Sequence, residues 1–330
     1  MANPKKAFKM LMTCLLKDRP AMLWGKMGEG KSDTVRAAVK ALGNCLLIDR
    51  RVSAMESVDL SGLPSIIDGR SCYARPEFYP TEEEAAKYDF VAIFFDEVNL
   101  NPAMFASLYG LVQDREINGH KLPANCRIVA AGNRPQDHSF VHKFPAALSD
   151  RFLHIDFDAN NADWQDWART NGIDERLIDF VEFRPNIFED VDMSERAFCT
   201  RRGLAACNKW IDESEDIRFS LLKGEIGIGA AGELQTYLRI RDNLPPIAKI
   251  LESPNAFNVP FDKPDLMFAL CMALADKVDV KTMANFTAFI NRMPKDMTVL
   301  AMVTAVKKKP HLKKTVEYIN HEIETKDISL

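Results

Sequence analysis

Residues 25–32 read Gly-Lys-Met-Gly-Glu-Gly-Lys-Ser and fit the pattern G-x-x-x-x-G-K-[ST] of a phosphate-binding loop. Gly25, Gly28 and Gly30 allow backbone N–H groups to turn inward around phosphate oxygens. In such a loop Lys31 reaches the β- and γ-phosphates, and Ser32 offers its hydroxyl to Mg²⁺. The stretch therefore predicts a nucleoside triphosphate with magnesium as the ligand.

The residues on either side of this loop favour a strand followed by a helix. Residues 21–24, Ala-Met-Leu-Trp, form a short apolar run after Pro20 that is typical of a buried strand. Residues 31–42 suit a helix that ends at Gly43, and its positive N-terminal end would aim at the phosphates. This context favours a phosphate loop over an ordinary glycine-rich turn.

Composition excludes several other classes of protein. The chain has 330 residues, 47% hydrophobic and 27% charged, which indicates about two globular domains with a sizeable core. We expect no membrane span and no signal peptide, and a cytoplasmic protein, because no long apolar run occurs. The seven cysteines form no C-x-x-C pair and the six histidines lie at no ligand spacing with them, so free thiols are expected and a zinc site is not.

Charge argues weakly against broad nucleic-acid binding. The formal net charge is −4, whereas non-specific binding to nucleic acid needs a basic face. One basic run lies at 307–314, and we interpret it as a solvated junction between helices.

Strands and helices alternate in the first half of the chain. Further short apolar strands are expected at 44–49, 90–95, 127–131 and 154–157, and the helices between them include 102–115 with Asn101 as its cap. Wholly apolar strands that alternate with helices predict a parallel sheet covered on both faces, which is an α/β fold. The dipeptides Asp68-Gly69 and Asn118-Gly119 predict two β-hairpins, because they readily supply the positive φ angles of a tight turn.

The second half of the chain is predicted to be helical. The expected helices span 160–183, 196–213, 229–252, 264–277, 281–292, 296–308 and 311–325. Gly224, Gly227 and Gly229 are expected to form a loop, and no Lys-[ST] follows them that would make a second phosphate site.

Polar side chains follow two of the expected strands. Asp96 and Glu97 come directly after the most apolar strand, at the carboxyl edge of the sheet where the phosphate loop lies. Asp96 would hold Mg²⁺, and Glu97 would orient and deprotonate an attacking water. Asn133 ends the next strand and could bind the γ-phosphate or that water.

Two arginines complete the candidate set. Arg151 stands just ahead of the last strand, where it could reach the nucleotide of a neighbouring subunit or form a salt bridge with Asp150. In Thr200-Arg201-Arg202, at the start of an expected helix, an arginine could clamp the γ-phosphate.

The order and spacing of these residues resemble the AAA+ ATPases, and within them the MoxR-type branch. The matches are residues 25–32 to Walker A, Phe94-Phe95-Asp96-Glu97 to Walker B, Asn133 to sensor 1, Arg151 to the arginine finger and Arg201 to sensor 2. The two hairpins stand where that branch has one in its second helix and one before sensor 1, and the stretches 59–64 and 96–99 are also similar to the family. The resemblance covers residues 1 to about 215.

The resemblance implies a domain layout and a set of ligands. It implies a P-loop NTPase sheet sandwiched by helices at 1–157, an α-helical lid at 158–255 and a helical extension at 256–330. ATP and Mg²⁺ are the implied ligands. The nucleotide-binding residues would be Gly25, Met27, Gly28, Glu29, Gly30, Lys31, Ser32 and Asp33, with Ser32 and Asp96 on the metal and Glu97, Asn133, Arg151 and Arg201 catalytic.

The resemblance also implies partners. It implies a homo-oligomeric ring, a hexamer in this family, with ATP between subunits. It implies a chaperone-like activity that remodels or activates a protein complex, often with a partner that contains a von Willebrand factor A domain. Two alternatives remain open from the sequence: a nucleic-acid motor or loader, for which the basic run is the only support, and a nucleotide-gated scaffold with little turnover.

Overall fold

The computed structural model describes residues 2–134, 141–189 and 195–324. The chain divides into two compact units, which we describe separately. The first comprises residues 1–170 and 200–203, and the second comprises residues 171–199 and 204–330. The division into lid and extension after residues 157 and 255 stays a prediction.

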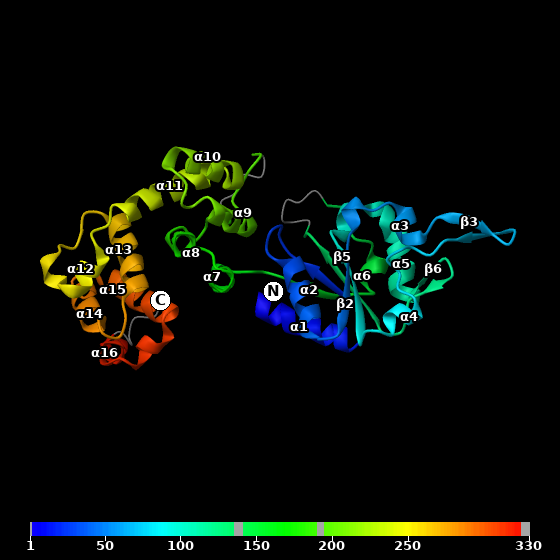
Figure 1. Cartoon of the computed structure of the whole chain (residues 1–330), viewed down its shortest axis with the longest axis horizontal. Coiled ribbons are helices and arrows are strands. Elements are labelled where there is room, and N and C mark those ends of the chain that lie inside the picture. The colour runs from blue at the N-terminus through cyan, green and yellow to red at the C-terminus, as the bar shows by residue number, and fades with distance from the viewer. Residues whose placement is uncertain (1, 135–140, 190–194, 325–330) are drawn as a thin grey trace. The chain divides into compact units, whose positions relative to one another are not determined.

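A five-stranded parallel sheet forms the centre of the first unit (Figure 1). Its strands lie in the order β2 (Cys45–Arg51), β5 (Phe90–Asp96), β8 (Cys126–Gly132), β1 (Ala21–Trp24) and β9 (Leu153–Asp156). Every neighbouring pair is parallel. All five carboxyl ends therefore lie at one edge, where the phosphate loop follows β1, the strand between β8 and β9. The α/β fold predicted from the sequence is confirmed.

Alternation along β5 explains why both faces of the sheet are covered. Ala92 and Phe94 pack with α1 (Pro4–Leu16) and α2 (Lys31–Ala41), whereas Val91, Ile93 and Phe95 pack on the opposite face. The helices of that second face are α3 (Ser57–Ser61), α4 (Glu82–Ala85), α5 (Phe105–Asp114) and α6 (Ala146–Ser149). The last helix of residues 1–170 is α7 (Asn161–Thr170).

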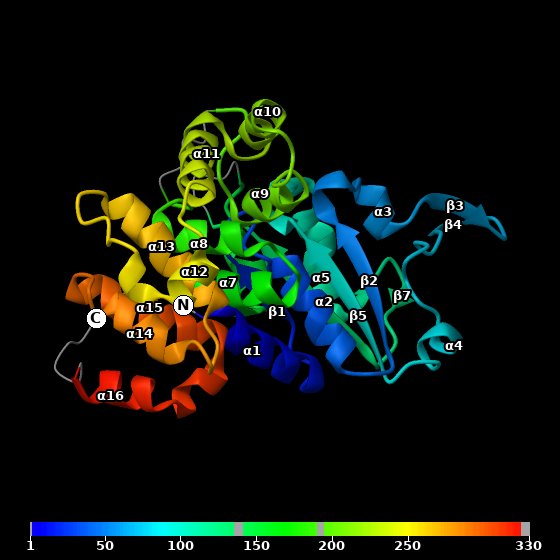
Figure 2. The same ribbon diagram turned by 60° about the vertical axis from the view of Figure 1, so that its left-hand side comes forward.

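Both predicted hairpins are present. They are β3–β4 (Pro64–Ile67 and Arg70–Tyr73) and β6–β7 (Glu116–Ile117 and His120–Lys121). Asp68 and Asn118 have φ of 49° each, and Gly69 and Gly119 have φ of 74° and 86°, as a type I′ turn requires. The β3–β4 hairpin projects from the sheet in both views (Figure 2).

Two hydrogen bonds join the hairpin regions to each other. The amide of Asn118 donates to the carbonyl of Ser61 at 2.7 Å, and Nε2 of His120 lies 2.8 Å from the carbonyl oxygen of Tyr73. Each bond connects residues more than 40 positions apart, so the turn region of the β6–β7 hairpin is held to the base of the β3–β4 hairpin.

The described part of the second unit is helical. Its helices are α8 (Glu175–Phe183), α10 (Glu215–Ile226), α11 (Ile228–Asp242), α12 (Ile247–Glu252), α13 (Pro264–Lys277), α14 (Met283–Ile290), α15 (Lys295–Lys308) and α16 (Val316–Glu324). The short α9 (Arg201–Ala206) begins in the first unit and leads into the second. None of the described helices is both long and apolar enough to serve as a membrane span.

Several expected helix boundaries are wrong. The helix expected over 160–183 is two helices, because Gly172 with φ 70° interrupts it. The helix expected over 196–213 begins only at Arg201 and is followed by a 3₁₀ turn at Cys207–Lys209. The helix expected over 311–325 is a 3₁₀ turn at Pro310–Lys314 followed by α16, and residue 325 lies outside the described residues.

The loop expected at Gly224, Gly227 and Gly229 is also wrong. Gly224 lies within α10 and Gly229 within α11, and only Gly227, with φ 80°, separates the two helices. A Cβ atom at Gly227 would lie 2.4 Å from the carbonyl oxygen of Ala197, so this position requires glycine.

The cap expected at Asn101 is replaced by another contact. Its side chain forms no capping bond but donates to the carbonyls of Val52 and Met55, at 3.2 and 2.8 Å. The segment after it begins as a 3₁₀ turn at Pro102–Met104, and α5 follows. Asn101 therefore fixes the segment after β2 to the segment after β5.

A network of charged side chains lies inside the second unit. Lys308 on α15 contacts Asp179 on α8 at 2.6 Å and also pairs with Asp276 on α13. Arg241 on α11 contacts both acids at 2.5 Å. Burial opposes the charge on Lys308, but Asp179 and Asp276 raise the pKa of its ammonium above the usual value. The network therefore joins four helices through buried charged side chains.

This network corrects the expectation of a solvated basic run at 307–314. The Lys308 side chain is only 6% exposed, and the ammonium of Lys309 donates to the carbonyls of Asp276 and Val278 at 2.8 and 2.6 Å. Two of the lysines in the run are thus internal contacts of the fold.

Replacement of Lys308 by methionine tests the role of this network. Lys308→Met leaves buried carboxylates without their main partner, so we expect the free energy of unfolding to fall by about 3–5 kcal/mol. Lys313→Met is the matched control, because Lys313 is exposed, and it should change stability by no more than about 0.5 kcal/mol. Urea denaturation followed by circular dichroism measures both, and equal midpoints for the two variants would contradict the structural role.

Candidate functional site

The phosphate loop lies between β1 and α2, as the sequence predicts. Gly28 and Gly30 have φ of 77° and 91°, a region that other residues rarely adopt. A Cβ atom at Gly28 would lie 3.2 Å from Cβ of Thr200, so this glycine also allows the segment before α9 to approach the loop.

The ammonium of Lys31 joins the loop to the neighbouring strand. Its Nζ donates to the carbonyls of Gly25 and Lys26, both at 2.7 Å, and to Oδ1 of Asn133 at 2.9 Å. Lys31 is 8% exposed, so these acceptors replace the water that a cation loses on burial. The predicted residues Lys31 and Asn133 are therefore in direct contact.

Ser32 and Asp96 meet across the same edge of the sheet. The hydroxyl of Ser32 donates to Oδ2 of Asp96 at 2.5 Å, and the backbone N–H of Glu97 donates to Oδ1 at 2.9 Å. Asp96 is 7% exposed. A hydroxyl and a carboxylate are oxygen ligands of the kind Mg²⁺ prefers, so this pair fits the magnesium ion that accompanies a nucleotide.

Glu97 adopts an unusual backbone conformation. Its φ is 58° and its ψ is 35°, the left-handed region that a non-glycine residue seldom occupies. The turn directs its carboxylate to Ser53, whose hydroxyl donates to it in a short hydrogen bond. Such backbone outliers are concentrated at functional sites.

Sequence reasoning missed Ser53. The signal was available only through the register of the sheet, in which Arg51 on β2 pairs with Asp96 on β5. Residues that follow the ends of these two neighbouring strands must lie close together, and Ser53 and Glu97 do so.

Glu29 places a carboxylate inside the phosphate loop. Its Oε2 accepts from the backbone N–H of Lys26 at 3.0 Å, and its Oε1 lies 3.7 Å from the guanidinium of Arg201. Burial raises the pKa of Glu29 above its usual value, although Arg201 lowers it. The side chains of Glu29 and Arg201 are only 2% and 13% exposed.

The two arginines near residue 201 therefore differ in position. Arg201 is directed to the loop, whereas Arg202 is exposed. Thr200 caps α9 by accepting a hydrogen bond from the N–H of Gly203 at 3.0 Å, which fixes the start of the helix next to Gly28.

Arg151 lies away from this cluster. In the described part of the chain its guanidinium donates to Oε1 of Gln113 at 2.6 Å, to the hydroxyl of Tyr109 at 2.7 Å and to the carbonyl of Ala147 at 2.5 Å. It also stacks on the ring of Tyr109, and Asp150 is 3.9 Å away. Its contacts are thus with α5, α6 and Asp150.

Two residues of the predicted nucleotide set point outward. The side chain of Met27 is 46% exposed. Asp33 pairs with Arg36 at 3.1 Å, and its side chain is 70% exposed. At these positions only the backbone of the loop and of the first turn of α2 is available to a phosphate.

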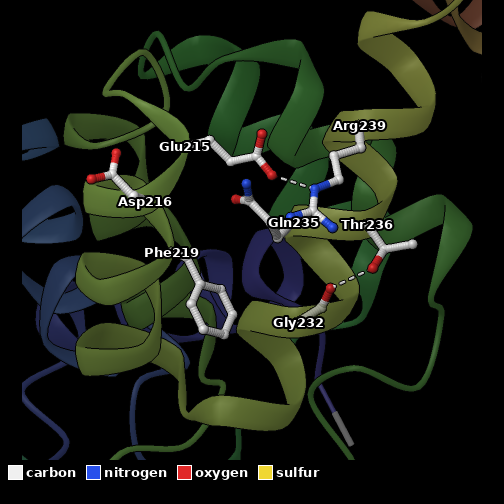
Figure 3. A pocket seen from close by; sticks show the side chains of 7 residues that line it. All are labelled: Glu215, Asp216, Phe219, Gly232, Gln235, Thr236 and Arg239. Carbon is white, nitrogen blue, oxygen red and sulfur yellow. Dashed lines mark hydrogen bonds and ion pairs between the residues drawn. The ribbon is translucent and has the colours of Figure 1, made fainter.

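Hollows occur in both units. One of about 280 Å³ adjoins the cluster and is lined in part by Trp24, Asn99 and Asp156. Another, of about 740 Å³, lies between α10 and α11 in the second unit, with Phe219 at its wall and an ion pair between Glu215 and Arg239 (Figure 3). No residue predicted for the nucleotide lines this larger hollow.

Comparison with known proteins finds similarity in solved structures only. No protein-family model matches the chain, and neither does any curated protein. The Thermotoga maritima RuvB Holliday junction branch migration motor is 15% identical, with 88% of this chain and 86% of that chain covered and a TM-score of 0.40. Hsp104 in its closed state with ATPγS and FITC-casein is 16% identical, with 68% and 42% covered and a TM-score of 0.36. These values are low, so the function of this chain must be inferred from its own residues.

Glu29 provides a test of phosphate binding in the loop. The ionised carboxylate repels an incoming phosphate, so Glu29→Gln should tighten ATP binding roughly tenfold. The raised pKa means that the folded protein holds the proton of Glu29 more tightly than the unfolded chain does. Repulsion is therefore small at acidic pH and grows as pH rises through the pKa of Glu29.

The measurement is isothermal titration with ATP and Mg²⁺ at several pH values. The ratio of the two affinities should increase with pH, because the titration of ATP itself affects both proteins alike. Asp33→Asn is the control, since Asp33 is also an acid of this region but points outward. An affinity ratio near one at neutral pH would contradict the position of Glu29 inside the binding loop.

Proposed function

We propose that this protein is an ATP hydrolase of the AAA+ class, of the MoxR type, which acts as a ring-shaped oligomer. One observation carries the proposal. Six of the predicted residues lie together at the carboxyl edge of a parallel sheet. They come from the ends of β1, β5 and β8 and from the start of α9, and are Glu29, Lys31, Ser32, Asp96, Asn133 and Arg201. This is where open α/β sheets bind their ligands.

The contacts suggest how hydrolysis would proceed. Lys31 would bind the β- and γ-phosphates, and Asn133, already hydrogen-bonded to Lys31, would contact the γ-phosphate or the water. Magnesium held through Ser32 and Asp96 would neutralise charge on the phosphate oxygens. Glu97 would take a proton from the attacking water. The oxygen of that water would form a bond to the γ-phosphorus while the bond from phosphorus to the β–γ bridging oxygen breaks, which gives ADP and phosphate.

Glu97 must change partners to act as this base. Its carboxylate accepts from the hydroxyl of Ser53, so that bond competes with the attacking water. Arg201 would likewise exchange Glu29 for the γ-phosphate. Both exchanges would make the site sensitive to the presence of the third phosphate.

Arg151 supports the ring. It contacts α5 and α6, away from the cluster of its own chain, which is the position expected of an arginine that adds a cation to the site of another subunit. We propose that Arg151 contacts the nucleotide of the neighbouring subunit, and that it releases Tyr109 and Gln113 to do so. A hexamer is the proposed assembly.

The β3–β4 hairpin is the proposed point of contact with a client protein. The β3–β4 hairpin projects from the sheet in Figure 1. Ile66 in this hairpin is 83% exposed and Leu63, directly before it, is 61% exposed, so both apolar side chains face solvent. Movement of the hairpins on hydrolysis would press on a partner complex. We propose remodelling or activation of that complex as the biological output, with a von Willebrand factor A domain protein as a candidate partner.

The alternative of a nucleic-acid motor has less support than the sequence alone gave it. It depended on the basic run at 307–314, in which Lys308 is buried against acids and Lys309 is bound to backbone carbonyls. A scaffold with little turnover differs from the proposed enzyme only in rate, which a steady-state ATPase assay with and without candidate partners measures.

Two substitutions separate binding from turnover. Lys31→Ala should abolish ATP binding, because it removes the cation that contacts the phosphates. Glu97→Gln should bind ATP with near wild-type affinity and lose at least about a hundredfold in turnover, because it lacks the base. The assays are nucleotide titration and phosphate release, and Lys40→Ala, at an exposed position of the same helix, is the control. Wild-type turnover by Glu97→Gln would refute the assigned role.

Mixed rings test the position of Arg151. Lys31→Ala subunits keep Arg151, and Arg151→Ala subunits keep the phosphate loop, so each variant alone should be inactive. In a mixed ring, an Arg151→Ala subunit supplies an intact phosphate loop, and a neighbouring Lys31→Ala subunit supplies Arg151. Together they form a complete site, so ATPase activity should reappear. A mixture as inactive as its components, with mixed oligomers verified by mass spectrometry, would show that Arg151 does not act across the interface.

A further inference from the structure

Asn99 is a buried polar residue that the proposed reaction does not use. It lies in the 3₁₀ turn at Val98–Leu100, directly after Glu97, and is 1% exposed. Its amide donates to the carbonyl of Asn133 at 2.7 Å, and its Oδ1 accepts from the N–H of Asn133 at 3.2 Å. One side chain thus satisfies both backbone groups of Asn133.

Gly132, the residue before Asn133, has no side chain that would block this contact. A Cβ atom at Gly132 would lie 2.7 Å from Oδ1 of Asn99, closer than real atoms approach. Gly132 has no positive φ, so here the absence of a side chain serves close approach and not backbone conformation. The end of β8 therefore leaves space for Asn99.

Asn99 connects two parts of the proposed site. Asn133, whose backbone it holds, accepts from Lys31 through its side chain. Asn99 itself belongs to the same short turn as Glu97, whose left-handed conformation starts that turn. Its own carbonyl accepts from the N–H of His142 at 2.9 Å, which anchors the turn to the segment before α6.

We propose that Asn99 is a positioning residue that fixes the backbone of Asn133, and so the direction of its amide, relative to Glu97. The proposal rests on the ATPase function proposed above. Without the paired hydrogen bonds, Asn133 would keep its place at the end of β8 but lose a fixed orientation toward the γ-phosphate. Turnover and the preference for ATP over ADP would then fall, while affinity for the nucleotide as a whole would be largely kept.

Aspartate at this position gives a test that a purely structural role would not pass. A protonated carboxyl has the shape of the amide and can donate to one backbone group and accept from the other. An ionised carboxylate can only accept, so it would face the carbonyl of Asn133 without a proton. Function of Asn99→Asp should therefore be lost at high pH and recover as pH falls.

The surroundings decide where this recovery occurs. Burial favours the protonated form of a carboxyl placed at residue 99, and Asp156, which lines the same hollow, acts in the same direction. Arg134, His142 and Lys143 of that hollow act in the opposite direction. The expected result is accordingly a trend between pH 5.5 and 8.5 relative to the wild type at each pH, because that comparison removes any pH dependence that the two proteins share.

The experiment compares full-length wild type, Asn99→Asp, Asn99→Leu and Asn125→Asp. At pH 8.5 we expect Asn99→Asp and Asn99→Leu to lose at least about tenfold in kcat, with KM for ATP changed by less than about threefold. Toward pH 5.5 the Asn99→Asp deficit should shrink, and the Asn99→Leu deficit should stay constant. Asn125 donates to the carbonyls of Ala85 and Tyr88 at the opposite end of β8, so Asn125→Asp controls for lost stability alone.

A second readout does not depend on hydrolysis. The ratio of ADP to ATP dissociation constants, measured in the Glu97→Gln background, should decrease in Asn99→Asp at pH 8.5 and recover at pH 5.5. A wild-type protein without ATPase activity would refute the proposed function, and this ratio would then decide the role of Asn99. Wild-type kcat and nucleotide preference in both Asn99 variants, or an Asn99→Asp deficit that does not shrink at acidic pH, would overturn the inference.

Discussion

The candidate site depends on the hydrogen bonds of the buried Lys31 ammonium. An ammonium that has left water must be surrounded by acceptors, and Lys31 finds two in its own loop and one on Asn133. The loop follows β1 and Asn133 follows β8, and these strands are adjacent, with Trp24 paired to Gly132. The same cation therefore requires both the curled loop and the correct strand order, so that the fold and the site are formed by one set of contacts.

The other charges around the loop extend this principle. Asp96 is held by Ser32 and by the N–H of Glu97, and Glu29 is held by Arg201 and by the N–H of Lys26. Each buried acid has a hydrogen-bond donor, which offsets the cost of its burial. A nucleotide would replace these internal partners one by one, so binding exchanges existing contacts for new ones and does not create a charged site from an empty one.

Features encoded in short stretches were predictable from the sequence. The strands are apolar runs, the hairpins carry Asp-Gly and Asn-Gly, and the loop and the acids of β5 follow local patterns. Features that depend on distant contacts were not. The helix α10 was missed because the glycine that ends it is required by the carbonyl of Ala197, which no local pattern indicates. Lys308 looked like part of a solvated run because its acidic partners lie 129 and 32 residues away.

The site divides in the same way. The motif residues could be named, but the contacts of Ser53 and Asn99 could not be predicted, because they depend on strand register and on the shape of a turn. The burial of Glu29 against Arg201 was likewise invisible in the loop pattern.

The hydrogen bonds between the two hairpins have a mechanical consequence. Asn118 and His120 tie the β6–β7 hairpin to residues that flank the β3–β4 hairpin. The β6–β7 hairpin follows α5 directly, through Arg115, and β8 follows it by a short segment. A displacement of the strand that carries Asn133 would therefore reach the projecting hairpin without a long flexible connection. The two hairpins would rotate as one unit about a point near the sheet. A small shift at the carboxyl edge of the sheet would then produce a larger displacement near Ile66, which is far from that point.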